Sequence, residues 1–200
     1  MSVLAVAAVY TFLFLLGESA FRLFRVAPDV TRPGLHLACG LFSALVPFWL
    51  TRVEIVGLGL FFAAVMLVSM RISLLRSIHG VGRAGWGEVF FPLGVALAAL
   101  LYLPSNRPVY SLAILVLAIS DPLANVVGRR ATGVWANRLL FGKTPAGSLA
   151  FFASSTAICL VFLPPWQALL AGTALTAIEA ASPLGSDNLT IVAGAIVVLA

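Results

Sequence analysis

The segment VYSLAILVLAISDPLANVVGRR, from Val109 to Arg130, decides the fold of this 200-residue chain. It begins as an apolar run, and a bilayer-spanning helix needs roughly 20 mostly apolar residues, or about 17 at the short end. Asp121 lies near the end of the run, where an acid at membrane depth is unfavourable unless it is paired, hydrated or bound to a cation. The segment therefore predicts a membrane helix that carries a functional carboxylate.

Similar apolar runs recur along the whole chain, which is 62% hydrophobic and 10% charged, with a mean hydropathy of +1.10. Continuous runs favour helices, whereas a β-barrel would show alternation. We therefore predict an all-α fold, a polytopic transmembrane helical bundle of about eight spans, and a single integral-membrane domain over residues 1–200. The expected spans are 2–17, 35–50, 53–70, 88–104, 109–127, 147–163, 166–181 and 188–200.

The first run has no basic n-region and is interpreted as a span instead of a cleavable signal peptide. The two cysteines, Cys39 and Cys159, fall in separate apolar runs and are interpreted as packing residues. The net charge of +5 is attributed to loops beside anionic lipid, and nucleic acid is not an expected partner.

The basic residues separate by connection. When the connections between the expected spans are numbered along the chain, the even-numbered ones hold only Arg52 and Arg107. All the other basic residues lie on the odd-numbered connections. By the positive-inside rule the odd connections face the cytoplasm and both termini lie on the far side. The cations of the odd connections are Arg22, Arg25, Arg32, Arg71, Arg76, Arg83, Arg129, Arg130, Arg138 and Lys143.

Unusual polar residues collect on the same side as these cations. A charge pattern that only orients the chain would not require acids and amides to follow it. We therefore expect one water-accessible active site at the cytoplasmic face. The residues concerned are His36, Glu88, Asp121, Asn125, Lys143, Glu179 and Asp187.

Asp121, Asn125 and Gly128 are spaced i, i+4, i+7 and share one helix face. Mg²⁺ prefers one or two carboxylates together with phosphates and water, so Asp121 is a candidate ligand and Asn125 a neutral oxygen nearby. Gly128 would let a ligand approach the backbone. The alternative is that Asp121 pairs with a buried arginine and only fixes packing.

The glycine-rich stretch after this helix carries cations that suit a polyphosphate. Arg129 and Arg130 offer forks that match phosphate oxygens, and Lys143 offers a point charge. Alternatively, the two arginines only determine topology. The letters GKT do not complete a P-loop, because Asn137 stands where the earlier glycine is needed and no strand precedes it.

The following letters, GKTPAGS, add backbone amides at Gly147 and two hydroxyls, Thr144 and Ser148, just before a helix begins. A helix N-terminus favours a bound anion. These residues are therefore candidate phosphate ligands. The structural alternative is that Ser148 is simply an N-cap.

Other polar residues have two interpretations each. His36, which opens the second span, is a candidate proton acceptor or a helix-end cap. Glu88 lies in a first turn, where the helix dipole already favours it, whereas Glu179 lies near a C-terminus and needs a cationic partner. Arg83 is a candidate phosphate contact or a lipid-facing cation.

Three segments in this order, SDPLANVVGRR, GKTPAGSLAFF and SDNLT, resemble the membrane-integral kinase family that includes dolichol kinase and phytol kinase. TRPGLHLACG and GRAGWGEVFFPLG agree, so the resemblance extends from residue 31 to 190. Two positions depart from the family pattern. Pro33 stands where the family often has a second basic residue before its histidine, and Ser120 replaces a glycine before the aspartate.

The resemblance implies a kinase that transfers a phosphoryl group from CTP to a membrane-resident isoprenoid alcohol with Mg²⁺ as cofactor. Asp121, Lys143 and His36 would then be catalytic. Asp121, Glu179 and Asp187 would hold the metal, and Asn188 would join the nucleotide site, although Asp187 and Asn188 can also cap the last helix. The acceptor stays open among phytol, farnesol, geranylgeraniol, a polyprenol and diacylglycerol, as does a homo-oligomer.

Two other functions stay open. A cytidylyltransferase like CDP-diacylglycerol synthase would attack the α-phosphorus of CTP and release pyrophosphate, although its lysine–aspartate and histidine–glycine signature is not found here. A small anion transporter would use the cations to attract its solute. Transporters tend to show internal repeats and midplane sites, whereas these polar residues gather at one face.

Overall fold

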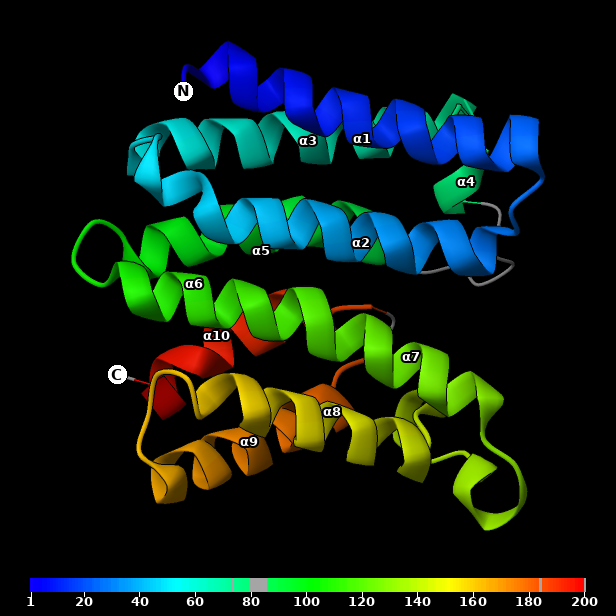
Figure 1. The fold of residues 1–200 in the computed structure, drawn as a ribbon, viewed down its shortest axis with the longest axis vertical. Coiled ribbons are helices and arrows are strands. Elements are labelled where there is room, and N and C mark those ends of the chain that lie inside the picture. The colour runs from blue at the N-terminus through cyan, green and yellow to red at the C-terminus, as the bar shows by residue number, and fades with distance from the viewer. Residues whose placement is uncertain (73, 80–85, 184, 200) are drawn as a thin grey trace.

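A computed structural model describes residues 1–72, 74–79, 86–183 and 185–199, and these residues fold into a helical bundle without strands (Figure 1). The predicted all-α fold is therefore confirmed. The helices are α1 (Val3–Phe24), α2 (Pro28–Leu45), α3 (Arg52–Ile72), α4 (Arg76–His79), α5 (Gly87–Tyr102), α6 (Arg107–Leu115), α7 (Asp121–Arg130), α8 (Pro145–Cys159), α9 (Pro165–Ala180) and α10 (Asp187–Leu199). In Figure 1 α1 and α3 lie at the top, α8 and α9 lie at the bottom, and the last helix, α10, lies between α6 and α9.

Each of the eight predicted ranges falls on a helix, and the range 109–127 falls on α6, a π-helical turn (Val116–Ser120) and α7 in succession. Two boundaries differ clearly. α1 continues to Phe24, since Glu18 and Arg22 pair one helical turn apart. α2 starts at Pro28, since a proline in the first turn followed by Asp29 favours a helix N-terminus.

Three segments are long and apolar enough to cross a membrane by length and composition: Val3–Phe24, Arg52–Ile72 and Arg107–Arg130. α5 and α8 are shorter apolar helices. Large apolar side chains such as Phe12, Phe61 and Leu170 are exposed on the outside of the bundle. Such a surface is suited to lipid and not to water. The number of spans stays a prediction.

The middle of the bundle is the segment formed by α6 and the π-helical turn. Tyr110, Leu112, Ile114 and Leu117 are almost completely buried there. This segment packs against α2, α5, α8 and α10. Its position fixes where α7 begins, and therefore where Asp121 lies relative to the other helices.

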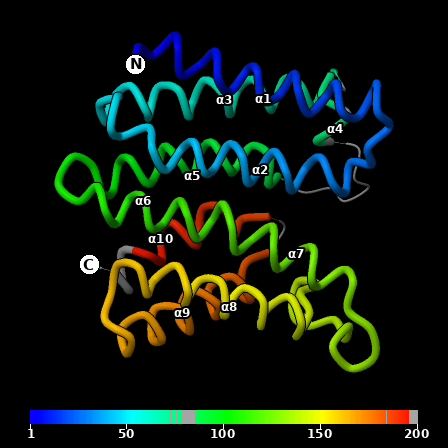
Figure 2. The backbone as a smooth tube through the Cα atoms, in the orientation of Figure 1, coloured from blue at the N-terminus to red at the C-terminus, as the bar shows by residue number. Residues whose placement is uncertain are grey.

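The connections alternate between the two ends of the bundle. The α5–α6 and α8–α9 turns lie at the left-hand end in Figure 1, together with the N-terminus, while α7 and residues 131–144 lie at the right-hand end. Figure 2 shows the same arrangement in the backbone trace. Of the polar residues singled out in the sequence, Asp121 and Asp187 begin α7 and α10, and Glu179 lies in the last turn of α9.

Candidate functional site

Asp121 stands where the long central helix changes its winding. Pro122 lacks an amide donor, and its ring crowds the carbonyl four residues earlier, so the regular α-helical pattern cannot continue through this point. The chain responds with the π-helical turn over Val116–Ser120, directly before Asp121. The carbonyl oxygen of Leu117 in this turn lies 3.1 Å from Nε2 of His36. The break therefore places Asp121 beside the start of α2.

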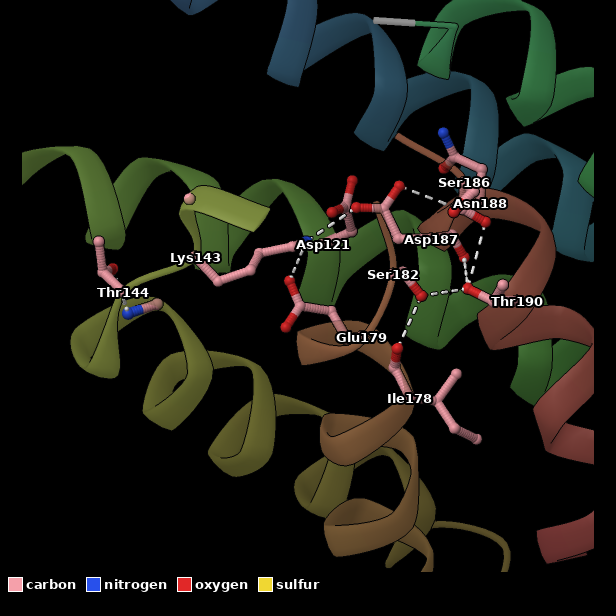
Figure 3. A network of polar contacts seen from close by, with 12 residues as sticks. Asp121, Lys143, Thr144, Ile178, Glu179, Ser182, Ser186, Asp187, Asn188 and Thr190 are labelled. Carbon is pink, nitrogen blue, oxygen red and sulfur yellow. Dashed lines mark hydrogen bonds and ion pairs between the residues drawn. The ribbon is translucent and has the colours of Figure 1, made fainter. Parts of the chain in front are cut away.

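An acidic cluster forms where α7, α9 and α10 meet. One carboxylate oxygen from each of Asp121, Glu179 and Asp187 lies within 4.8 Å of the others. Lys143 reaches into this cluster from the α7–α8 connection: its Nζ donates to Glu179 and, at 2.9 Å, to Oδ2 of Asp187 (Figure 3). The structure thus brings together the predicted metal ligands and the predicted catalytic lysine.

Lys143 is mostly buried, since its side chain is 20% exposed. Burial alone would lower the pKa of its ammonium group, but the nearby carboxylates of Asp187, Glu179 and Asp121 outweigh this, so the pKa lies above the usual value. Lys143 is therefore a permanent positive charge at neutral pH. It is suited to binding an anion and unsuited to removing a proton.

Hydroxyl groups fix the turn that carries Asp187. Ser182 donates to the carbonyl of Ile178 at 2.6 Å and is 2.5 Å from the hydroxyl of Thr190 (Figure 3). Thr190 in turn bonds the carbonyl of Ser186. These bonds hold the end of α9 against the start of α10, and they thereby position Glu179 near Asp187.

A second ion pair lies beside the acidic cluster. Arg32 of α2 contacts Oε1 of Glu88 in α5 at 3.1 Å, and the Glu88 side chain is only 8% exposed. Asn188 donates to the carbonyl of Gly87 at 2.9 Å. The prediction explained Glu88 by the helix dipole alone, and the structure adds Arg32 as its partner. These contacts join the starts of α2, α5 and α10.

Several buried polar atoms at this site have no hydrogen-bond partner within the described ranges. Buried polar groups are nearly always paired, so such atoms require an explanation. Three are acceptors that would suit a cation or a donor from a ligand, and the fourth is a hydroxyl. They are Oε2 of Glu88, Oε2 of Glu179, Oδ1 of Asn188 and Oγ of Ser148.

His36 lies between Asp121 and an aromatic ring. Its Nε2 is 4.0 Å from Oδ2 of Asp121, and its ring centre is 4.5 Å from that of Phe91. Because Nε2 faces the carbonyl oxygen of Leu117, that nitrogen carries the proton in the neutral ring. Nδ1 is then the nitrogen that can accept one. In the described part of the chain, no arginine lies within ion-pair distance of Asp121.

The predicted phosphate ligands of α7 lie in different surroundings. Asn125 accepts from Nε of Arg129 at 2.8 Å, and Arg129 also contacts Asp29. Arg130 is exposed and does not line the cavity described below. Arg83 lies outside the described residues.

Gly128 and Gly147 have a packing role that the sequence did not reveal. A Cβ at Gly128 would lie 2.6 Å from Oγ1 of Thr144, and one at Gly147 would lie 2.9 Å from the carbonyl oxygen of Ala124. The two glycines therefore let α7 and the start of α8 approach closely. Thr144 occupies the position that a side chain at Gly128 would take, and Gly128 itself lines the cavity described below, so its predicted role beside a ligand stays a prediction.

Thr144, and not Ser148, is the N-cap of α8. Its hydroxyl accepts from the amide of Gly147 at 3.1 Å. Pro145 follows at the first helical position, where a missing amide donor has no cost. Ser148 lines the cavity, and its hydroxyl is buried without a hydrogen-bond partner among the described residues.

One cavity of about 560 Å³ joins these groups. Four acids and four cations line its polar end, and an apolar arm extends from there between α1, α2, α3 and α5. The polar end can hold a cation and a phosphate-rich ligand together, and the arm can hold a hydrocarbon. The charged residues are Glu88, Asp121, Glu179, Asp187, Arg32, Arg129, Arg138 and Lys143.

Arg32 and Arg138 were not predicted as site residues, and Glu88 was grouped with the polar residues of the site without a role in it; all three line this cavity. Arg32 and Glu88 lie in TRPGLHLACG and GRAGWGEVFFPLG, the two additional segments that resemble the kinase family. Their position in these segments could have indicated that they belong to the site. Arg138 lies in the same glycine-rich connection as Lys143, and its guanidinium donates to the carbonyl of Gly142 at 2.9 Å.

Comparison with known proteins identifies a relative. The chain is 31% identical over 196 residues to phytol kinase of Synechocystis sp., and the match covers 90% of this chain and 82% of the relative. No protein-family model matches the chain, and no solved structure matches it.

Proposed function

The chain belongs to the phytol kinase and dolichol kinase family, and on that premise we propose that it transfers the γ-phosphoryl group of CTP to the hydroxyl of a membrane-resident isoprenoid alcohol. The acceptor would be phytol, farnesol or a related alcohol. The reaction would take place at the cytoplasmic face, where the positive-inside rule puts the odd connections.

The observation that carries this proposal is the continuity of the cavity. Its polar end gathers carboxylates and cations, and the same space continues into an apolar arm. A nucleotide arrives from water, whereas an isoprenoid alcohol is dissolved in the bilayer. A cavity with one charged and one apolar part can receive both and let them meet near Asp121. Four carboxylates at the polar end also disfavour a carrier for a free anion.

The residues at the polar end fit a divalent cation. Asp121, Glu179 and Asp187 offer hard oxygen ligands that lie close together, as Mg²⁺ requires. Lys143 occupies one oxygen of Glu179, and the other, Oε2, is buried without a partner. Asp121, Glu179 and Asp187 would hold Mg²⁺, whose contribution is to neutralise and orient the β- and γ-phosphates.

Positively charged side chains would bind the remaining phosphate oxygens. Lys143 is held by its two carboxylates at the centre of the site, and Arg32 and Arg129 line the same cavity. Phosphoryl transfer depends mainly on positioning and charge stabilisation. Ser148, whose buried hydroxyl has no partner, would donate to a phosphate from the start of α8.

His36 is the proposed proton acceptor. Its Nε2–H is fixed by the carbonyl of Leu117, which leaves Nδ1 able to take the proton of the acceptor hydroxyl. The alcohol oxygen would form a bond to the γ-phosphorus while the bond between that phosphorus and the β–γ bridging oxygen breaks. The products are the prenyl phosphate and CDP, and the proton leaves through His36.

The direct test uses purified protein with a prenol and CTP labelled at either the α- or the γ-phosphate. The γ-label should appear in prenyl phosphate and the α-label in CDP, and ATP serves as the comparison nucleotide. Release of pyrophosphate would instead identify a cytidylyltransferase. Uptake of an anion into proteoliposomes without nucleotide turnover would identify a transporter.

A further inference from the structure

We propose that the apolar arm of the cavity is a closed-end pocket that limits the acceptor to a tail of three to four isoprene units. This inference rests on the proposed kinase function and adds to it the site of the hydrocarbon and the structural element that sets its length. It is carried by the course of the arm along α2 and α3 and by the residues that close its far end.

The arm runs along one face of each of two helices. His36, Cys39 and Ser43 line it at spacings of three and four residues along one face of α2, and Val46, directly after the helix, continues this line. At 1.5 Å per residue, the ten residues from His36 to Val46 correspond to about 15 Å.

The opposite wall runs along α3 from Met66, beside the polar end, to Ile55. Eleven residues at 1.5 Å each correspond to about 16 Å, in agreement with the α2 wall. α1 packs on α2, and α3 packs on α5, and the arm lies between these two pairs of helices. Phe14, Phe62 and Phe91 supply much of its aromatic surface.

The far end of the arm is closed by buried side chains. Val46 and Ile55 are each 2% exposed, and the hydroxyls of Tyr10 and Ser43 bond each other across the end at 2.8 Å. Ser43 also donates to the carbonyl of Cys39 at 2.7 Å, so the polar atoms there are satisfied internally. We call Tyr10, Ser43, Val46 and Ile55 the floor. A tail that reaches the floor has no further apolar space to enter.

The length of the arm sets the size of the tail. An alcohol whose oxygen lies beside His36 and Asp121 has about 15–16 Å of arm below it, counted from the helix rise. An isoprene unit adds four main-chain carbons, and with carbon–carbon bonds of about 1.5 Å its extended length is roughly 5 Å. Three fully extended units, or four in a bent chain, therefore fill the arm, and a long polyprenol cannot be contained in it.

The first test changes the floor and measures kcat/KM for prenols of 10, 20 and 25 carbons. Val46→Ala removes two carbons and Ile55→Ala three, together the five of one isoprene unit. We expect the double variant to raise the ratio of the 25-carbon to the 20-carbon alcohol at least tenfold. A gain for the longer substrate cannot result from misfolding.

Val46→Trp should have the opposite effect and lower the ratio of the 20-carbon to the 10-carbon alcohol at least tenfold. The matched control is Leu45→Trp, because Leu45 is the neighbouring residue but is 49% exposed on the outside of the bundle. It should leave both ratios unchanged. Unchanged ratios in the Val46 and Ile55 variants would overturn the closed-end pocket.

The second test does not depend on catalysis. A 20-carbon prenol with a diazirine at the end of its tail is photolysed with the wild-type protein in detergent without nucleotide. Fragmentation of the labelled peptides should place the label on Val46 or Ile55 themselves, and excess unlabelled prenol should remove it. Label confined to outward-facing residues such as Leu41 and Leu45 would refute the pocket. Absence of prenol phosphorylation by wild type would refute the proposed function instead.

Discussion

Nζ of Lys143 lies 2.9 Å from Oδ2 of Asp187, although 44 residues separate them in the chain. The same ammonium group donates to Glu179, so one cation from the α7–α8 connection joins the end of α9 to the start of α10. Asp121 of α7 completes the group. The centre of the site therefore depends on contacts between four separate segments, and substitutions there should affect stability as well as activity.

Replacement of Lys143 by methionine should destabilise the protein, because it leaves Glu179 and Asp187 buried without their cation. Removing one partner of a buried ion pair typically costs about 3 kcal/mol or more. For a chain of this size that corresponds to a decrease of roughly 6–12 °C in the unfolding midpoint. The midpoint can be measured by thermal unfolding in detergent.

A double variant separates charge from packing. Lys143→Met combined with Glu179→Gln should recover a substantial part of the lost midpoint, because the unpaired carboxylate is then neutral. Arg130→Met is the control, since that cation is exposed and outside the cavity, and it should change the midpoint little. Strictly additive losses in the double variant would show that the pair is not coupled.

Asp121→Asn should lower kcat about a thousandfold or more if this carboxylate holds the metal and the phosphates, since such electrostatic contributions amount to several kcal/mol. The enzyme should remain folded, because asparagine is nearly the same size. Glu54→Gln is the matched control. Glu54 bonds Thr51 at the start of α3 and does not line the cavity, and its replacement should leave kcat unchanged.

Metal binding should be visible without turnover. Mg²⁺ added to metal-free wild type should raise the unfolding midpoint, because a ligand that binds only the folded state stabilises it. Glu179→Gln and Asp121→Asn should weaken this shift, and a chelator should abolish kinase activity reversibly. An equal Mg²⁺-induced shift in wild type and both variants would place the metal elsewhere.

Gly128→Ala should be destabilising by about 1–3 kcal/mol, because the new methyl group would lie too close to Thr144. Gly57→Ala provides the comparison: it lies inside α3 with no atom near the added carbon. That substitution should stabilise the protein by about 0.5–1 kcal/mol through helix propensity. Both changes can be followed by thermal unfolding, and equal effects would contradict the close approach of α7 and α8.

The two hydroxyls at the start of α8 should behave differently. Thr144→Ala should lower stability by about 1 kcal/mol, because it removes the N-cap bond to Gly147. Ser148→Ala should leave stability unchanged or slightly raised, since its hydroxyl is buried without a partner. If Ser148 binds a phosphate, KM for CTP should rise several-fold in that variant. A stability loss without any change in KM would assign Ser148 a structural role.

The helices and the grouping of polar residues could be predicted because each has a local cause. Apolar runs of bilayer length produced the helix ranges, and the sorting of charges by connection placed Asp121, Lys143 and Asp187 at one end. Glu179 was expected to need a cation because of its place at a helix C-terminus, and Lys143 is that cation.

Features that depend on packing between distant segments could not be predicted. The contact between Gly128 and Thr144 and the pair of Arg32 with Glu88 require the relative positions of different helices. The hydrophobic arm was hidden for a similar reason, because Cys39 and Ser43 have no pattern that distinguishes a cavity wall from a packed core. The extension of α2 back to Pro28 was missed because its first turns are polar.

The closed floor has a consequence for the direction in which lipid moves. An alcohol whose tail occupies the arm cannot leave past Val46 and Ile55, so it must exit on the side by which it came in. The phosphorylated lipid would then be returned to the leaflet that supplied the alcohol. Such an enzyme changes the head group without acting as a flippase, and any crossing to the opposite leaflet would require a separate protein.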